Sequence, residues 1–185
     1  MNVNLINSIE ALLFGAGRPI RLSEIKNILE NNGVKSELSD IKKSLNSLEK
    51  RYLDTSIQIQ DVASGYRIQI KQEHSSCIGT LWNEKAPRIS KALMETISII
   101  AYKQPVTRGD IEDIRGVTVS TRSIRSLLER NWIKVSGYRD IPGRPTLYIT
   151  TKEFLDDLNI KNISDLPELP EKTEIKEDSI ISKAV

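Results

Sequence analysis

The stretch "WIKVSGYRDIPGRPTLYIT", Trp132 to Thr150, decides the fold prediction for this chain. Two runs typical of β-strands, "WIKVSGY" and "TLYIT", flank the turn sequence "DIPGRP". Proline fixes its own φ and glycine tolerates a positive φ, so Pro142 and Gly143 suit a tight chain reversal. The stretch therefore predicts a β-hairpin that presents Arg144 between two stiff prolines.

Three amphipathic patterns with helical spacing precede this hairpin. The apolar positions are Leu93, Ile97, Ile100 and Ala101 in the first, Ile111 and Ile114 in the second, and Ile124, Leu127 and Leu128 in the third. Pro105 ends the first helix and Gly116 ends the second. We expect Ile111 and Ile114 to be buried, which leaves Asp110, Glu112 and Asp113 on an ordinary solvated face.

The same order of elements is predicted in the first third of the chain. Helical stripes run through Leu5, Ile9, Leu12 and Leu13, then Ile25, Ile28 and Leu29, and then Leu38, Ile41, Leu45, Leu48 and Leu53, which we expect on the buried side of the third helix. The alternating runs at Ile57, Ile59 and Ile68, Ile70 predict a hairpin around Ala63–Ser64–Gly65. Pro19, Ile25 and Ile28 fall on Pro105, Ile111 and Ile114 at an offset of 86, and Gly33, Ile41 and Leu45 fall on Gly116, Ile124 and Leu128 at an offset of 83. One domain fold is therefore predicted twice.

Three helices followed by a hairpin are typical of a winged helix-turn-helix domain. We predict an α+β, mainly helical fold with two tandem winged helix-turn-helix domains, each with three helices plus a β-hairpin. Their expected bounds are residues 1–75 and 90–155, joined by a linker over 76–89 that has room for a short helix around Ile78. Residues 156–185 lose periodicity and carry 8 acidic against 4 basic side chains, so we expect a flexible, disordered acidic tail.

Composition and charge exclude several classes of protein. The net charge is only +2, divided as +2 over residues 1–89, +4 over 90–155 and −4 over 156–185, which falls short of a basic patch for nucleic acid. The single cysteine excludes an intrachain disulfide. The N-terminus lacks the basic start of a signal peptide, and no run approaches the roughly 20 apolar residues of a membrane span. We expect a cytoplasmic protein without membrane contact.

Few residues have the chemistry that catalysis requires. The one histidine, His74, lies three residues from Cys77, but nothing nearby supplies an orienting carboxylate or an oxyanion hole. Two soft ligands are too few for a zinc site. Gly15 and Gly17 lack the Lys-Ser/Thr sequence of a phosphate-binding loop. We therefore expect no enzymatic activity, no cofactor, no metal and no small-molecule substrate.

A winged helix binds either DNA or protein, and the residues of the second domain bear on the choice. Arg122, Arg125 and Glu129 line the outward side of its third helix, where Glu129 would be repelled by phosphate. Specific DNA-binding surfaces are more positive than this one. Tyr138 beside the hairpin turn suits a protein interface, because Tyr and Arg are favoured at interface centres. Protein docking is the preferred hypothesis; the alternative is a winged-helix DNA-binding transcriptional regulator.

Three segments of the chain strongly resemble the ScpB family, bacterial segregation and condensation protein B. They are "IEALLFGAGRPI", "ETISIIAYKQPVTRGDIEDIRGV" and "SLLERNWIKVSGYRDIPGRPTLYITTKEFL". Asn131 stands before "WIKV" where the family pattern leads us to expect a glycine, and asparagine is the non-glycine residue that best tolerates a left-handed helix cap. The similarity runs through the two predicted domains in the same order.

The resemblance implies a function that spacing alone does not give. ScpB-like proteins are non-catalytic subunits of the bacterial SMC condensin complex, where a homodimer binds the kleisin ScpA, and through it SMC, in chromosome condensation and segregation. The resemblance thus implies a nucleoid-associated protein, with at most weak, non-specific DNA contact through the complex. It places dimerisation on the first domain, with Leu5, Ile9 and Leu12 as candidates. It places kleisin contact on the second, with candidates Tyr138, Arg139, Pro142 and Arg144.

Overall fold

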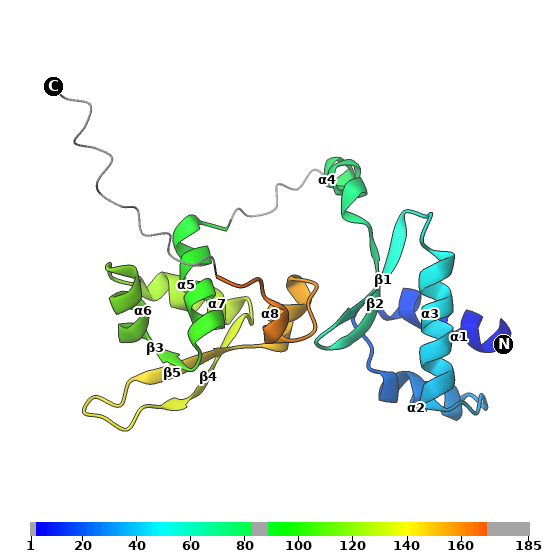
Figure 1. The fold of residues 1–185 in the computed structure, drawn as a ribbon, viewed down its shortest axis with the longest axis horizontal. Helices are drawn as coiled ribbons and strands as arrows, with labels where there is room; N and C mark the ends of the chain where they lie inside the picture. The colour runs from blue at the N-terminus through cyan, green and yellow to red at the C-terminus, as the bar shows by residue number, and fades with distance from the viewer. Residues whose placement is uncertain (1–2, 83–88, 170–185) are drawn as a thin grey trace.

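The computed structural model describes residues 3–82 and 89–169, which form two units (Figure 1). Each unit has its own apolar core. The first unit contains α1 (Val3–Ala16), α2 (Leu22–Asn31), α3 (Leu38–Arg51), β1 (Ile57–Val62) and β2 (Gly65–Ile70). The second contains α5 (Lys91–Lys103), β3 (Val106–Thr107), α6 (Arg108–Arg115), α7 (Thr121–Glu129), β4 (Ile133–Tyr138), β5 (Thr146–Thr150), α8 (Lys152–Asp157) and the short 3-10 helix η2 (Ile163–Asp165). The chain therefore folds as mixed helix and strand with small sheets.

The first unit buries most of the apolar stripes of its three helices beneath one hairpin. The prediction of burial is wrong for Leu38 and Leu53, which lie at and beyond the two ends of α3 and are 44% and 68% exposed. Side chains without exposed surface include Ile9 of α1, Ile25 of α2 and Ile41 of α3. Strands β1 and β2 pair antiparallel, with Ile57 opposite Ile70. The predicted hairpin is confirmed, and its turn is Ala63–Ser64.

Gly65 starts β2 at a point of close backbone approach. Its φ is +138°, and a Cβ at this position would lie 2.3 Å from the carbonyl oxygen of Ile20. Ile20 and Tyr66 exchange two backbone hydrogen bonds of 2.8 Å here, which attach the α1–α2 connection to the hairpin. Only glycine fits, because any side chain would push these two backbones apart.

The second unit repeats this arrangement with a three-stranded sheet of order β3-β5-β4. Val106 of β3 pairs with Tyr148 of β5, as Ile20 pairs with Tyr66 in the first unit. Val106 lies 86 residues after Ile20, which is the offset predicted for this part of the repeat. The two units therefore share a backbone bridge as well as the order of helices and strands.

Helix α6 differs from the prediction in which side chains it buries. Ile111 has no exposed surface, but 54% of Ile114 is exposed, so the prediction that both are buried is wrong for Ile114. Ile114 lies in the last turn of this eight-residue helix, two positions before Gly116, which ends the helix in a left-handed conformation. Asp110 is not an ordinary solvated residue either. Its carboxylate completes a capping box with Thr107 at the start of the helix.

Order continues beyond residue 156, where the acidic tail was predicted to begin. The indole nitrogen of Trp132 donates to a carboxylate oxygen of Asp157 at 2.7 Å, and Leu166 packs against the core of the second unit. The Tyr102 hydroxyl donates to the carbonyl oxygen of Pro167 at 2.5 Å, which ties residues after η2 to α5. These contacts supply the burial that the acidic composition does not indicate. The rest of the predicted tail, 170–185, lies outside the described residues.

Between the two units the chain forms η1 (Gln72–His74) and α4 (Ser75–Trp82). Helix α4 matches the short helix expected around Ile78 in the linker, whose later part, residues 83–88, lies outside the described residues. Across residues 3–82 and 89–169, no helix is both long enough and apolar enough to cross a membrane.

Candidate partner-binding surfaces

The tip of the β4–β5 hairpin is a short, well-defined turn. The amide of Arg144 donates to the carbonyl oxygen of Ile141 at 2.9 Å, across Pro142 and a Gly143 with φ of +87°. Proline followed by a glycine at positive φ is the arrangement of a type II turn. The amide of Arg139 donates to the carbonyl oxygen of Pro145 at 2.9 Å and closes the loop. The prediction of a tight reversal built on Pro142 and Gly143 is confirmed.

Three of the candidate kleisin-binding residues lie exposed together at this tip. Tyr138 keeps 60% of its surface accessible, and Pro142 and Arg144 are exposed as well. The guanidinium carbon of Arg144 lies 5.9 Å from the centroid of the Tyr138 ring. A cation at this distance from a ring face is weakly attracted to it. The turn thus holds an aromatic ring and an arginine side by side.

The fourth candidate, Arg139, is engaged with α6. Its two terminal nitrogens bind the two carboxylate oxygens of Asp110 at 2.8 and 2.7 Å, a bidentate ion pair. Hydrogen bonds from Arg139 and from the Thr107 amide lower the pKa of Asp110 from 3.8 to about 2. Because Asp110 caps α6, the pair attaches the hairpin to the start of that helix. Arg139 therefore orients the tip, and its guanidinium is already occupied.

The dimerisation candidates lie on α1, and the structure places them at different depths. Leu5 is buried and Ile9 has no exposed surface, because both belong to the core of the first unit. Leu12 is only half-buried at the edge of that core. Side chains in the core are not available to a partner while the unit keeps this fold. Of the three, Leu12 alone reaches the surface.

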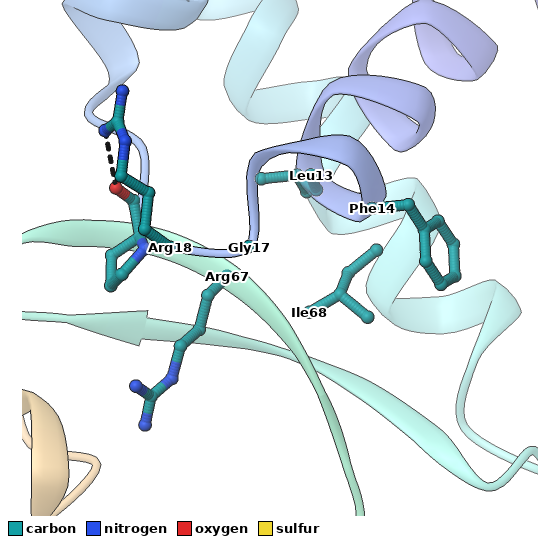
Figure 2. Close-up of a pocket in the computed structure, with 7 residues that line it drawn as sticks. Leu13, Phe14, Gly17, Arg18, Arg67 and Ile68 are labelled. Carbon is teal, nitrogen blue, oxygen red and sulfur yellow. Dashed lines mark hydrogen bonds between the residues drawn. The ribbon is translucent and has the colours of Figure 1, made fainter.

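A hollow of about 190 Å³ lies at the end of α1, next to β2 (Figure 2). Leu13, Phe14 and Ile68 form its apolar side, and 55% of Phe14 is exposed. Arg18 at its rim pairs with Glu24, with 2.5 Å between nitrogen and oxygen. Figure 2 shows the Arg67 side chain extending away from Leu13 and Phe14. Phe14, which the sequence patterns did not single out, is the most exposed apolar side chain of this region.

The outward side of α7 carries fewer free positive charges than its sequence suggests. Arg125 and Glu129 form an ion pair with a nitrogen–oxygen distance of 3.3 Å, and both side chains are largely exposed. Arg122 is exposed near them. Since Glu129 neutralises Arg125, this face presents little net positive charge to a phosphate backbone.

His74 and Cys77 lie in η1 and α4, where both are part of the link between the two units. The His74 Nε2 lies 3.4 Å from a carboxylate oxygen of Glu73, and Cys77 is exposed. Within the two described ranges, no group of three or more His, Cys, Asp or Glu side chains converges as metal ligands would.

Two sets of contacts were not found by sequence reasoning. The first is the Asp110–Arg139 pair, for which the sequence does hold a signal, because Thr107 and Asp110 have the spacing of a capping box before a helix. The second is a group of hydrogen bonds from the β1–β2 hairpin to Asp156 in α8 and to Asn159 just after it, about 90 positions later. No local pattern encodes a contact at that separation.

Known proteins resemble this chain along most of its length. A family model described as segregation and condensation complex subunit ScpB matches residues 7–169. The segregation and condensation protein B homolog of Coxiella burnetii is 41% identical over 91% of this chain and 80% of its own length. Segregation and condensation protein B of Clostridium tetani is 40% identical over 90% of this chain and 86% of its own length.

Solved structures with partial similarity carry related descriptions. A crystal structure of ScpB from Mycobacterium tuberculosis is 24% identical, covers 83% of this chain and 94% of that chain, and has a TM-score of 0.39. A crystal structure of a dimer of the ScpB N-terminal domain with an ScpA peptide is 24% identical and covers 48% of this chain and 94% of that chain, with a TM-score of 0.38.

Proposed function

The chain belongs to the ScpB family of segregation and condensation complex subunits, and on that premise we propose that it is a non-catalytic subunit of the bacterial SMC condensin complex. It acts as a homodimer that binds the kleisin ScpA, and through it SMC, in chromosome condensation and segregation. The observation that carries the proposal is the family match across residues 7–169. A cytoplasmic, nucleoid-associated location follows from this role.

The proposal includes the fold and domain organisation. The first unit is a winged helix-turn-helix domain over residues 1–75, the linker covers 76–89, and the second winged helix begins at residue 90. The shared backbone bridge to the hairpin supports one fold used twice. Because Trp132 donates a hydrogen bond to Asp157 and Tyr102 donates one to the carbonyl oxygen of Pro167, the second domain extends beyond residue 155 and includes α8.

The kleisin-binding surface is the exposed tip of the β4–β5 hairpin, with Tyr138, Pro142 and Arg144 in contact with ScpA. Tyrosine and arginine are over-represented among residues that dominate binding energy. A turn fixed by Pro142 and Gly143 loses little conformational entropy on binding, which favours affinity. Arg139 contributes indirectly, because its pair with Asp110 fixes the direction of the hairpin.

The dimer surface is the exposed edge of α1 around Leu12 and Phe14, together with the hollow beside Ile68. A large exposed aromatic ring next to an apolar hollow is a self-complementary pattern, in which each Phe14 enters the other copy's hollow. Leu5 and Ile9 support this surface from beneath. Phe14→Glu should shift the protein from dimer to monomer in sedimentation equilibrium, whereas Leu53→Glu, at an apolar side chain elsewhere on the first unit that is exposed to 68% against 55% for Phe14, should not.

Calorimetric titration with purified ScpA tests the proposal directly. Tyr138→Ala and Arg144→Ala should each weaken binding about five- to thirtyfold, as interface anchors of about 1–2 kcal/mol do. Lys103→Ala on the far helix α5 is the matched exposed control and should bind normally. Full affinity in both tip variants would refute the choice of surface, and absence of any ScpA binding by the parent protein would refute the function.

The alternative function is a DNA-binding transcriptional regulator that uses α7, where Arg122 has no carboxylate within ion-pair distance among the described residues. Such a protein binds a short duplex tightly at physiological salt, with affinity that falls steeply as salt rises. We expect only weak binding that is independent of sequence. Nanomolar, sequence-dependent binding that Arg122→Ala abolishes would establish the alternative instead.

A further inference from the structure

The strap is defined here as residues 156–161, which are the last two residues of α8 and the four that follow it. It binds the side of the β1–β2 hairpin. The backbone amide of Ser64 donates to a carboxylate oxygen of Asp156 at 2.9 Å. The ammonium group of Lys161 contacts the carboxylate of Asp61 at 2.6 Å. Asp156 is only 8% exposed, so its carboxylate is buried by the contact that it makes. The two units are thereby joined at the tip of the first hairpin, where α8 lies between them (Figure 1).

Asn159 is the central residue of the strap. It has a left-handed φ of +58°, a conformation that asparagine tolerates better than most residues. In this conformation its side-chain oxygen accepts from Arg67 at 2.7 Å, and its carbonyl oxygen accepts from Gln60 at 3.1 Å. The same Arg67 nitrogen donates to the carbonyl oxygen of Asp156 at 2.8 Å. One turn of backbone thus accepts three hydrogen bonds from two polar side chains of the hairpin.

The strap closes one side of a cleft of about 540 Å³ between the two units. Four cationic side chains line this cleft: Arg21 before α2, Lys42 on α3, Lys152 on α8 and Lys161 on the strap. Within residues 3–82 and 89–169, the one carboxylate that lines it is that of Asp61, which is already paired with Lys161. No carboxylate of the described residues lies within ion-pair distance of Arg21, Lys42 or Lys152. The cleft therefore has three cationic side chains without an ion-pair partner among the described residues, although the carboxylate of Glu24, whose pKa is lowered mainly by Arg18, also interacts with the charge of Arg21.

The walls of the cleft also contain apolar side chains, which limits the ligands that suit it. Leu22 and Leu38 line it, and 44% of Leu38 is exposed. A nucleic-acid backbone would satisfy the cations but would leave these apolar groups without a partner, since it binds mainly through its phosphates. A peptide that carries both carboxylates and an apolar side chain matches both features.

We propose that this cleft is a second docking site, which binds an acidic peptide segment of a protein partner. Carboxylates of the peptide pair with Arg21, Lys42 and Lys152, and an apolar side chain covers Leu22 and Leu38. The site exists only while the strap holds the two units together, because residues of both units line it. It is separate from the β4–β5 tip, and its existence does not depend on the function of that tip.

Fluorescence anisotropy of the full chain with a labelled peptide of alternating glutamate and leucine tests the charge requirement. Lys42→Gln and Lys152→Gln should each weaken binding about two- to fivefold, the usual contribution of one exposed ion pair. Lys43→Gln is the matched control, because Lys43 neighbours Lys42 in the sequence but does not line the cleft and lies near Asp40. Equal losses in all three variants would show non-specific attraction and overturn the site.

Variants that break the hydrogen bonds of the strap distinguish binding in the closed cleft from non-specific attraction between the protein and the acidic peptide. Asp156→Ala removes a negative charge, so simple attraction predicts tighter binding of the acidic peptide, whereas loss of the closed cleft predicts binding about two- to tenfold weaker. Asn159→Gly provides the same test without a change of charge, and glycine retains the left-handed conformation. Circular dichroism checks that both variants fold. If Asp156→Ala does not fold, the affinity of Asn159→Gly for the peptide tests the proposal. Unchanged or tighter binding would overturn the proposal.

Two further probes decide the nature of the occupant. A peptide of glutamate alone should bind more weakly than the alternating peptide, because it cannot cover Leu22 and Leu38. Equal affinity would overturn the apolar part of the proposal. A short DNA duplex should bind without sensitivity to Asn159→Gly. A duplex that outcompetes the peptide and responds to the strap variants would identify the cleft as a nucleic-acid site instead.

Discussion

The ion pair between Arg139 and Asp110 gives a prediction whose size follows from the structure. Asp110 has a pKa of about 2 in the folded protein against an ordinary value of 3.8. A shift of that size corresponds to at most about 2 kcal/mol of folding free energy. The Asp110 side chain keeps 29% of its surface exposed, so solvent screens the pair and the expected contribution falls to roughly 1 kcal/mol.

The sign of the pH dependence follows from the lowered pKa. A carboxylate whose pKa is depressed by folding stabilises the folded state fully at pH values above 3.8, and this stabilisation is lost as the pH falls towards 2. Asp110→Asn has no such charge at any pH. The stability difference between the parent protein and Asp110→Asn should therefore be constant near neutral pH and shrink as the pH falls from about 4 to about 2.

Thermal unfolding followed by circular dichroism measures this effect. A loss of roughly 1 kcal/mol lowers the midpoint of a domain of this size by about 4–8 °C. Arg139→Gln should cause a similar loss, and the double variant with Asp110→Asn should be no less stable than the worse single variant, since the pair is lost only once. Strictly additive losses, or an unchanged midpoint in Arg139→Gln, would refute the assignment of Arg139 as a clamp for the hairpin.

Three other predictions concern the residues that shape the two units. Gly65→Ala should destabilise the first unit by roughly 2–3 kcal/mol in urea unfolding, since its Cβ would overlap backbone. Gly15→Ala, where a Cβ meets nothing within 4 Å, should instead stabilise it by about 0.4–1 kcal/mol, and equal losses in both would contradict the steric argument. Trp132→Phe should cost about 1–2 kcal/mol because it removes the 2.7 Å hydrogen bond from the indole nitrogen to Asp157, and an unchanged urea midpoint would show that this bond contributes nothing. Thr107→Ala should cost about 1 kcal/mol through loss of the α6 cap, whereas Thr107→Ser should retain most of the stability in thermal unfolding.

Much of the fold follows from local patterns in the sequence. The stripes of isoleucine and leucine predict the helices, since a helix must bury one face to be stable. The alternating residues and the Pro142–Gly143 turn predict both hairpins, and Asn131 has the positive φ, +55°, that its place before the strand implied. The resemblance to ScpB rests on the same local segments. These features can be predicted without knowing the tertiary contacts of the residues.

The candidate surfaces were only partly predictable, for a different reason. The α1 stripe identifies Leu5 and Ile9 as apolar, but apolar side chains serve cores and interfaces equally, and only packing shows that Ile9 is enclosed. Arg139 has the residue type of a binding group, and only the approach of α6 shows that its guanidinium is occupied. In each case the sequence specifies the chemistry of the side chain but does not show which residue that side chain contacts.

The sequence by itself determined the helices, the hairpins, the repeat and the family of this protein, because each depends on residues close together in the chain. The tertiary structure decided where the second unit ends, which α1 side chains reach the surface, and how the strap meets the first hairpin. Asp156 and Ser64 are 92 positions apart, and their hydrogen bond forms only once both units have folded and met. An acidic residue in a polar stretch has no local signature of burial, which is why composition alone placed residue 156 in a tail.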